Sequence, residues 1–324
     1  MPNIIYGALS FAMSVYAALK AKNIPVFCFA VSDTVGNPET IDGVPVINVE
    51  NLLEYKDSAT VFIAVSIAPA SLQEEIIETL RKNGFKNIIP LTNQTLNETL
   101  FNYYSDQNDI LLLPLQSETK DENNEMEILR VTSSYDKPLQ NSYKFPNYIK
   151  TFFNDSPKAR NYCELMAAYY LWKNSNAKIK GICQYRRIFT RVYFEPDTDV
   201  ILPMPLVFYP NIDAQRKRFV SDEDWNTALF VIKEIYPQYS DSIQRFFSRK
   251  ILYSFNMVAA KSEIFNDYCK WLFTILEKVE SIRGDETVRQ DRYLGYIGEC
   301  LTNLYFQHNK DKLRILHTGM EWLV

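Results

Sequence analysis

Two adjacent arginines, Arg186 and Arg187, occur in the segment GICQYRRIF at residues 181–189. The apolar residues around them predict a strand, in which neighbouring side chains point to opposite faces. One guanidinium would then pair with a carboxylate of the protein while the other faces a ligand, unless both lie just beyond the end of the strand. A guanidinium that faces a ligand can make two parallel hydrogen bonds to phosphate oxygens. The alternative is that both arginines form only structural ion pairs.

A carboxylate that can pair with one of these arginines lies in the preceding segment, NYCELMAAYYLWKN at residues 161–174. Its periodicity predicts a helix over residues 158–174. Asn161 and Glu164 share a stripe of that helix with apolar side chains, on the face that should pack inward. A buried carboxylate needs a partner. We therefore expect Glu164 to pair with one of the two arginines that follow.

Asp197 and Asp199 form an Asp-x-Asp sequence, and paired carboxylates suit a hard divalent cation. Asp199 also opens the segment DVILP at residues 199–203, and Asp is common in loops that lead into strands. We favour this second interpretation. The chain has two histidines, His308 and His317, which are too few for a histidine-based metal cluster. A site for Mg²⁺ or Mn²⁺ therefore requires Asp197, Asp199 and His317 to converge in the fold.

A long helix is predicted over residues 286–308. Its polar face aligns Asp291, Arg292, Gly295 and Glu299. A glycine within a helix costs about 1 kcal/mol relative to alanine, so Gly295 indicates that something approaches the backbone closely. This face is either solvated or in contact with a substrate. The opposite, apolar face is formed by Tyr293, Leu294, Ile297, Cys300, Leu301 and Leu304.

Several segments of the chain occur together, and in one order, in a known family. Across residues 126–310 they resemble a glycosyltransferase-like domain found on capsular and exopolysaccharide biosynthesis proteins and long described as of unknown function. Several blocks in the right order are harder to obtain by chance than a single motif. The resemblance implies a fold similar to the A-type, nucleotide-sugar-dependent glycosyltransferases, and transfer of a sugar onto a growing polysaccharide. The blocks are VTSSYDKP, NYCELMAAYYLWKN, GICQYRRIF, DVILP, FNMVAAKSEIFNDYCKWLF and RYLGYIGECL.

The resemblance also implies roles for individual residues. Glu299 or Asp291 is the candidate general base for an acceptor hydroxyl, and Asn256 would hydrogen-bond sugar hydroxyls. The family has Arg after the position of Glu299, whereas this chain has Cys300. The predicted donor-binding residues are Asn161, Glu164, Tyr185, Arg186, Arg187, Asn256 and Arg292.

Metal use is a separate expectation from the resemblance. Related transferase folds end this strand in an Asp-x-Asp that holds a divalent metal on the diphosphate, whereas this chain has QYRR at residues 184–187. Gln184 stands where the family has His, which removes a titratable group. Guanidiniums can neutralise the diphosphate without a cation, so we predict that no metal is required. His317 resembles a late metal-binding His of such transferases, and Mg²⁺ or Mn²⁺ binding is the alternative.

The first hundred residues alternate short apolar segments with amphipathic ones, which is typical of β-α-β units. One predicted helix covers residues 71–83, with Ser71 and Glu74 as a capping box and Gly84 as its C-terminal cap. The first strand and helix resemble the start of small Rossmann-like domains, but of their glycines only Gly7 is present. Dinucleotide binding needs those glycines. We expect an interaction domain or a vestigial nucleotide-binding domain.

The length of 324 residues suggests two domains, since one domain usually holds about 100 to 200 residues. We predict a Rossmann-like domain at 1–108, a polar linker at 109–125 that includes SETKDENNE, and a mixed α/β glycosyltransferase-like domain at 126–324. In the second domain, further helices are predicted near 221–236, where Ser221 caps the first turn, and near 262–279.

Composition excludes several classes of protein. The net charge of −4 disfavours nucleic acid as a partner. Nine glycines, with no GxxxxGK[ST] sequence, argue against P-loop and kinase functions. Five widely spaced cysteines, without a CxxC pair, are typical of reduced thiols in a cytoplasmic protein. No apolar segment is long enough to span a bilayer, and no export signal is evident.

The leading hypothesis is therefore a cytoplasmic glycosyltransferase that binds a nucleotide-sugar donor and an oligosaccharide or lipid-linked acceptor. We expect it to act at the inner face of the cell membrane, to which it would bind peripherally. The competing hypothesis is a non-catalytic sugar-binding or assembly partner of a polysaccharide synthesis machinery. The missing Asp-x-Asp and Gln184 favour this alternative, whereas the two arginines favour the enzyme.

Overall fold

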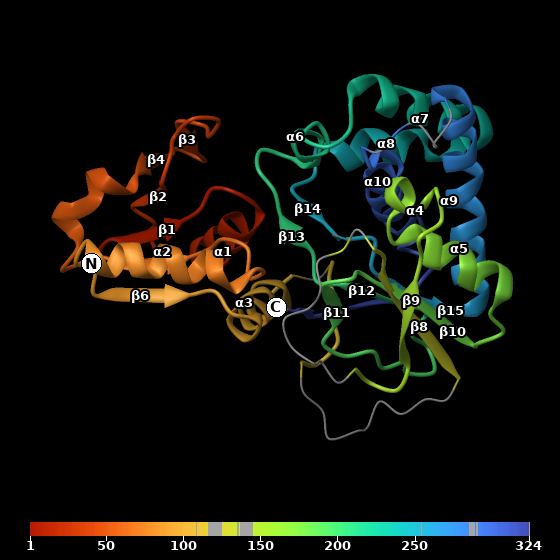
Figure 1. Cartoon of the computed structure of the whole chain (residues 1–324), viewed down its shortest axis with the longest axis horizontal. Coiled ribbons are helices and arrows are strands. Elements are labelled where there is room, and N and C mark those ends of the chain that lie inside the picture. The colour runs from red at the N-terminus through yellow and green to blue at the C-terminus, as the bar shows by residue number, and fades with distance from the viewer. Residues whose placement is uncertain are drawn as a thin grey trace. The chain divides into compact units, whose positions relative to one another are not determined.

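The computed structural model describes residues 1–107, 109–115, 125–134, 136, 145–253, 255–284, 289 and 291–323. The chain divides into two compact units (Figure 1). The first comprises Met1–Ile110, Leu206–Pro210 and Trp322–Val324, and the second comprises Leu111–Pro205 and Asn211–Glu321. Residues 116–124 of the predicted linker lie outside the described part of the chain. Among the described residues, no helix combines the length and apolar character needed to cross a bilayer.

The first unit is a Rossmann-like parallel sheet with strand order β3-β4-β2-β1-β5-β6. Only the edge strand β3 pairs in an antiparallel sense, and the remaining neighbours are parallel. The strands are β1 (Asn3–Tyr6), β2 (Cys28–Val31), β3 (Thr40–Ile41), β4 (Val44–Asn48), β5 (Thr60–Ile63) and β6 (Asn87–Pro90). The helices are α1 (Ser10–Ala21), η1 (Val49–Tyr55), α2 (Ala70–Lys82) and α3 (Asn93–Ser105); a later strand, β13 (Leu206–Val207), also belongs to this unit.

Helix ends in the first unit differ in part from the predicted ones. α2 begins at Ala70 with Pro69 as its N-cap and no side-chain cap, so the predicted capping box at Ser71 is wrong. Ser71 lies inside the first turn. Gly84 follows the helix with a φ of +91° and donates its N–H to the Arg81 carbonyl, as predicted for a C-terminal glycine. The helix α3 was not predicted, because residues 93–105 are rich in polar side chains. Its buried face is formed by Leu96, Asn97, Leu100 and Tyr104.

Gly7, the one glycine that remains of the dinucleotide fingerprint, has a local structural role. Its φ is +126°, and a Cβ there would lie 2.7 Å from the carbonyl oxygen of Ala64. The loop after β1 therefore needs glycine to pass the end of β5. A ligand is not needed to explain this residue.

The second unit contains a mixed sheet with strand order β7-β16-β12-β15-β10-β8-β9. β15 runs antiparallel to both of its neighbours, and the other neighbouring strands are parallel. The strands are β7 (Leu111–Leu112), β8 (Met126–Thr132), β9 (Ile149–Phe153), β10 (Ile179–Cys183), β12 (Val200–Pro203), β15 (Val258–Lys261) and β16 (Ile315–Thr318), with the shorter β11 (Arg187–Phe189), β14 (Ile251–Leu252) and β17 (Met320–Trp322) outside this sheet.

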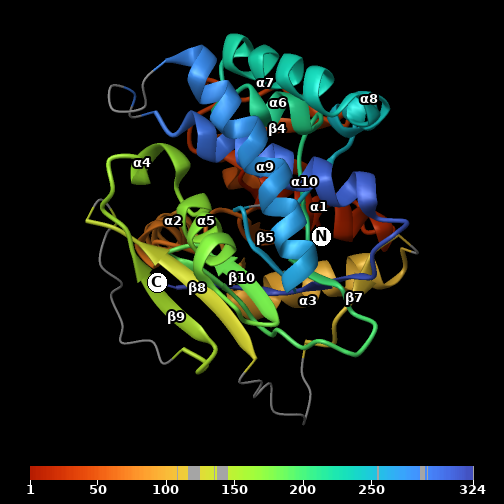
Figure 2. The same ribbon diagram turned by 90° about the vertical axis from the view of Figure 1, so that its right-hand side faces the viewer.

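Helices cover this sheet, and Figure 2 shows α5 and α9 lying over β8 and β10. β10 is buried along its whole length, as is typical of a central strand, and its one charged side chain, Lys180, donates to Oδ1 of Asn266 at 2.9 Å. The helices are α4 (Ala159–Tyr162), α5 (Leu165–Asn174), α6 (Ile212–Arg216), α7 (Asp222–Ile235), η2 (Pro237–Tyr239), α8 (Ser240–Phe247), α9 (Ser262–Arg283) and α10 (Tyr293–Asn309). The predicted mixed α/β fold is confirmed.

Several predicted elements of the second unit are interrupted. The predicted helix at 158–174 breaks into α4 and α5 at Cys163, whose φ is +50°. The predicted strand through GICQYRRIF ends at Cys183 and resumes at Arg187 after a turn. α10 begins at Tyr293, while Glu286, the predicted first residue, lies outside the described residues. The end of β10, the break at Cys163 and the start of α10 each lie next to polar residues of the predicted site.

The strand directions bring these interruptions to one edge of the sheet. β8, β9 and β10 are parallel, so their carboxyl ends share an edge, which is where open α/β sheets bind ligands. Because β15 runs in the opposite sense, its first residues lie at the same edge. The residues after Thr132 and Cys183 and those before Val258 therefore meet there.

Candidate active site

A pocket at this edge of the sheet collects residues from four separate segments of the chain. It is lined in part by Ser133, Asp136, Cys163, Glu164, Gln184, Tyr185 and Arg292. Of the predicted site residues, Glu164, Tyr185 and Arg292 are thus brought together. Asp136 was not predicted; it accepts hydrogen bonds from the N–H and hydroxyl of Ser133. Its motif is VTSSYDKP, of which Tyr135, Lys137 and Pro138 lie outside the described residues.

The turn that carries the QYRR sequence is held by a buried arginine of the neighbouring strand. The Arg187 N–H donates to the Gln184 carbonyl at 3.3 Å, which closes the turn. Nη1 of Arg130, on β8, donates to the Tyr185 carbonyl at 2.7 Å, and its Nη2 donates to the Thr151 hydroxyl at 3.2 Å. Sequence reasoning missed Arg130. The available signal was an arginine within the otherwise apolar segment ILRV at residues 128–131.

Arg186 and Arg187 differ in their surroundings. Arg187 is buried, and its guanidinium carbon lies 3.8 Å from the centre of the Phe255 ring. Burial, assisted by the charge of Arg186, lowers the pKa of Arg187 to about 10. Arg186 is partly buried and lies over the ring of Tyr185. The two side chains do not occupy opposite faces of a strand, because β10 ends before them at Cys183.

Two carboxylates, Glu164 and Glu299, lie in the field of Arg187. Burial raises the pKa of Glu164, opposed by a hydrogen bond from the Gln184 side chain and by the charge of Arg187. Burial also raises the pKa of Glu299, to about 7; the charge of Glu164 adds to this, while the Phe255 N–H and Arg187 oppose it. The hydrogen bond to Glu164 thus comes from Gln184, while Arg187 acts on Glu164 through its charge. We call Glu164, Arg187 and Glu299 the charge cluster.

Backbone strain concentrates around the charge cluster. Among the described residues, six non-glycine positions have a positive φ, and four of them are Cys163, Phe255, Asn256 and Arg292, at +50° to +73°. Such conformations cost of order 1–3 kcal/mol each and cluster at active sites. The observed strain therefore supports a functional role for this edge.

Buried polar atoms without partners also occur beside the charge cluster. Asn256 is 4% exposed, and its Nδ2 donates to the Gly295 carbonyl at 3.1 Å. Its Oδ1 has no hydrogen-bond partner among the described residues, and neither has Oε1 of Gln184. Each such acceptor costs about 1–3 kcal/mol if it stays unpaired. Groups that supply hydrogen bonds on ligand binding would relieve this cost.

The close approach predicted at Gly295 comes from the protein itself. A Cβ at this position would lie 2.8 Å from Sγ of Cys163 and 3.3 Å from the Asn161 carbonyl oxygen. Gly295 therefore permits α10 to pack against the end of α4. No substrate is needed to explain the glycine at this position.

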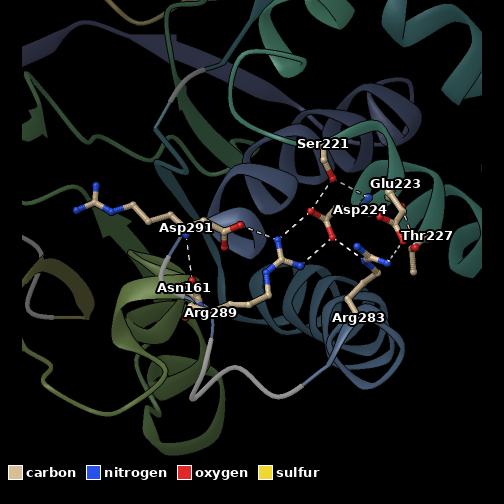
Figure 3. Close-up of polar contacts among 9 residues, drawn as sticks. Asn161, Ser221, Glu223, Asp224, Thr227, Arg283, Arg289 and Asp291 are labelled. Carbon is tan, nitrogen blue, oxygen red and sulfur yellow. Dashed lines mark hydrogen bonds and ion pairs between the residues drawn. The ribbon is translucent and has the colours of Figure 1, made fainter.

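Asn161 and Asp291 occupy a neighbouring network of polar contacts, shown in Figure 3. Nδ2 of Asn161 donates to the Arg289 carbonyl, and its Oδ1 accepts from the Arg292 N–H at 3.0 Å. Asp291 is exposed and pairs with Nη2 of Arg289 at 2.6 Å. Neither side chain lines the described pocket, and the predicted residues Arg186, Arg187, Asn256 and Glu299 lie outside its lining as well. Of the two predicted bases, Glu299 is the one that belongs to the charge cluster.

The carboxylates of the Asp-x-Asp sequence are engaged in ion pairs. Asp199 pairs with Nζ of Lys261 at 3.0 Å, and Asp197 pairs with Nη1 of Arg314 at 3.1 Å. His317 is buried, donates from Nδ1 to the Pro203 carbonyl at 3.1 Å, and has its pKa lowered by burial to about 4. In the part of the chain that the structure describes, no group of three or more His, Cys, Asp or Glu residues is placed to hold a metal.

The chain is similar in sequence to one protein family and in fold to a solved glycosyltransferase structure. Residues 150–310 match a family described as "Domain of unknown function (DUF4422)". The fold is similar to the apo structure of WbbM, a bifunctional glycosyltransferase, with a TM-score of 0.51, 21% identity and coverage of 62% of this chain. The chain thus has a glycosyltransferase-like fold. It spans 45% of the WbbM chain, so less than half of that protein has a counterpart here. Curated proteins give no match.

The raised pKa of Glu299 makes a prediction about stability. Between pH 4.5 and about 7 the folded state holds more protons than the unfolded state, so stability falls as pH rises through this window. Gln mimics the protonated acid. We expect Glu299→Gln to raise the free energy of unfolding by about 1–3 kcal/mol at pH 8 and to change it little below pH 4.5.

Urea denaturation of wild type and variant at pH 4.5 and pH 8 measures this difference. Glu277→Gln, at an exposed position of α9, is the matched control and should alter stability by less than about 0.5 kcal/mol at both values. Equal effects of Glu299→Gln at the two pH values would contradict the assigned pKa.

Proposed function

We propose that this protein is a glycosyltransferase, which moves a sugar from a nucleotide-sugar donor to a polysaccharide or lipid-linked oligosaccharide acceptor in capsule or exopolysaccharide biosynthesis. The observation that carries the proposal is the charge cluster, where burial raises the pKa of Glu299 to about 7 and the charge of the buried Arg187 opposes this rise. A general base works best when its pKa lies near the operating pH. The glycosyltransferase-like fold supports the same conclusion.

In the proposed reaction Glu299 takes the proton of an acceptor hydroxyl. The acceptor oxygen forms a bond to the anomeric carbon of the donor sugar, and the bond from that carbon to the diphosphate oxygen breaks. The bonding electrons leave with the nucleoside diphosphate, whose developing negative charge Arg186 and Arg292 stabilise. Arg187 keeps part of the Glu299 population ionised at neutral pH, because its charge opposes the effect of burial.

Recognition of the donor is proposed to use the residues around the pocket. Tyr185 and Arg292 line it, and Arg186 lies against Tyr185. Oδ1 of Asn256 and Oε1 of Gln184 are acceptors without partners among the described residues, which suits sugar hydroxyls. Asn161 acts indirectly, through its hydrogen bonds to the backbone of Arg289 and Arg292. We propose that the reaction takes place in the cytoplasm, with peripheral association at the inner membrane face.

A non-catalytic sugar-binding or assembly role is the second candidate. It is favoured by Gln184 and by the absence of an Asp-x-Asp after β10. Glu299 distinguishes the two functions, because a binding protein has no need for a base with a pKa near 7.

The first test combines binding with turnover. We expect some member of a nucleotide-sugar panel to raise the thermal midpoint and to release nucleoside diphosphate when oligosaccharide acceptors are added. Because Glu299 must be ionised, kcat/KM should rise with pH up to about 7 and then level off. Glu299→Gln should lower kcat at least about a hundredfold and keep donor affinity. Binding without release in wild type would favour the second candidate, and no response to any nucleotide would remove the transferase proposal.

A second test separates the two arginines. Arg186→Ala should weaken donor binding by about 1.5–3 kcal/mol without unfolding the protein, because it removes a charge-assisted contact to phosphate. Arg187→Ala should instead shift the rise of kcat/KM to higher pH, since Glu299 loses the charge that opposes its protonation. Calorimetry and pH profiles measure these effects. Arg314→Ala, in a separate ion pair with Glu195, is the control. Unchanged donor affinity in Arg186→Ala, or an unshifted pH profile in Arg187→Ala, would refute the assignment.

A third test concerns metal. With guanidiniums at the pocket, we expect activity and nucleotide binding to survive exhaustive chelation by EDTA. Addition of Mg²⁺ or Mn²⁺ should then change the rate by less than about twofold, since Arg stays charged at any relevant pH. Loss of activity on chelation and recovery with metal would show that Asp197, Asp199 or His317 had been misinterpreted.

A further inference from the structure

Arg289 lies between α9 and α10 and makes a two-pronged contact with a buried carboxylate (Figure 3). Its Nη1 and Nη2 lie 2.9 Å from Oδ1 and Oδ2 of Asp224 respectively. The guanidinium carbon also lies 3.6 Å from the centre of the Tyr293 ring. A bidentate contact of this kind fixes the orientation of both side chains, whereas an ion pair with a single hydrogen bond does not.

Asp224 is placed to act as a fixed anchor. Its side chain is 3% exposed and accepts further hydrogen bonds from Nε of Arg283 at 2.7 Å and from the Ser221 hydroxyl at 2.8 Å. Burial alone would raise its pKa, but the hydrogen bonds from Arg289, Arg283 and Ser221 hold that pKa far below its usual range. The anchor is therefore charged at every ordinary pH.

Capping of α7 does not account for this arrangement. Ser221 is the N-cap, as predicted, and its hydroxyl accepts the Asp224 N–H at 3.1 Å. The helix terminus is satisfied by that contact. The bond from Asp224 to Arg289 instead connects α7 with the residues that precede α10. The sequence predicted only the cap at Ser221, because the partner of Asp224 in this ion pair is distant in the sequence.

The anchor is connected to the pocket through the backbone of Arg292. Asn161 holds the Arg289 carbonyl with its Nδ2 and the Arg292 N–H with its Oδ1. Arg292 has a left-handed backbone, with φ +62°, and is the N-cap of α10. Its side chain lines the pocket with Glu164 and Tyr185. A strained residue at a helix start keeps its conformation only when its neighbours are fixed.

We propose that Asp224 and Arg289 are positioning residues, which hold Arg292 at the pocket and thereby set the affinity of the pocket for a nucleoside diphosphate. The inference rests on the proposed function, because it requires a phosphorylated ligand beside Arg292. It adds the ion pair between Asp224 and Arg289, neither of which lines the pocket, to the groups that control donor binding.

The experiment measures binding of UDP, GDP and ADP by calorimetry, with circular dichroism and urea denaturation to verify folding. Arg292→Asn removes the guanidinium with a residue that tolerates the left-handed conformation. We expect it to weaken binding of the preferred nucleotide at least tenfold. Asp224→Asn should weaken that binding three- to tenfold, and the double variant should bind no more weakly than Arg292→Asn alone.

Non-additivity separates positioning from a purely structural role, which would lower stability and leave nucleotide affinity unchanged. Glu223→Gln is the matched control: Glu223 also contacts Arg283, but its side chain is 74% exposed, and its loss should leave binding as in wild type. If Asp224→Asn does not fold, Arg289→Lys keeps the charge, loses the two-pronged contact and should show the same non-additivity with Arg292→Asn.

Two results would overturn the inference: wild-type affinity in folded Asp224→Asn and Arg289→Lys, or losses that multiply in the double variant. Failure of the wild type to bind any of the three nucleotides would overturn the proposed function and this inference with it. Normal wild-type binding with unaffected variants would refute the positioning role alone.

Discussion

The charge cluster is the constraint on which the second unit depends. One buried guanidinium, that of Arg187, lies in the field of two carboxylates, Glu164 and Glu299. It cannot fully balance both, so burial raises the pKa of each acid, and the charge of Glu164 adds to the rise at Glu299. Buried charges of this kind are tolerated only when hydrogen bonds satisfy them. The segments that donate those bonds, at Gln184 and Phe255, must therefore keep their conformations.

The surrounding backbone shows the cost of this requirement. Cys163, Phe255 and Arg292 all have a positive φ, which ordinary side chains avoid. Tight packing compensates for the strain, because Gly295 lets α10 approach the end of α4 more closely than any other residue would allow. Gly298 has the same effect against Leu165. Two glycines on one helix face thus bring Glu299 and Glu164 within electrostatic reach of each other.

Positive charge at the ligand edge of the sheet comes from arginines of different segments. Arg130 supports the turn after β10 from the neighbouring strand, while Arg292 reaches the pocket from the start of α10. The acidic pair Asp197 and Asp199, by contrast, forms ion pairs with basic side chains. A fold in which arginines rather than an acidic motif occupy the strand end is consistent with direct recognition of a diphosphate.

Local patterns in the sequence were enough to predict the fold class and several charged residues of the candidate site. Alternation of apolar strands and amphipathic helices predicted both α/β units, and the residue types of Arg186, Arg187, Glu164 and Glu299 indicated a charged site, because these signals depend on near neighbours in the chain. Tertiary structure alone decided the rest. The break at Cys163, the burial that raises the pKa of Glu299 to about 7, and the ion pairs of the Asp-x-Asp sequence all depend on partners distant in the chain. Desolvation and long-range charge pairing arise only when the sheet brings such segments to one edge, and no local spacing encodes them.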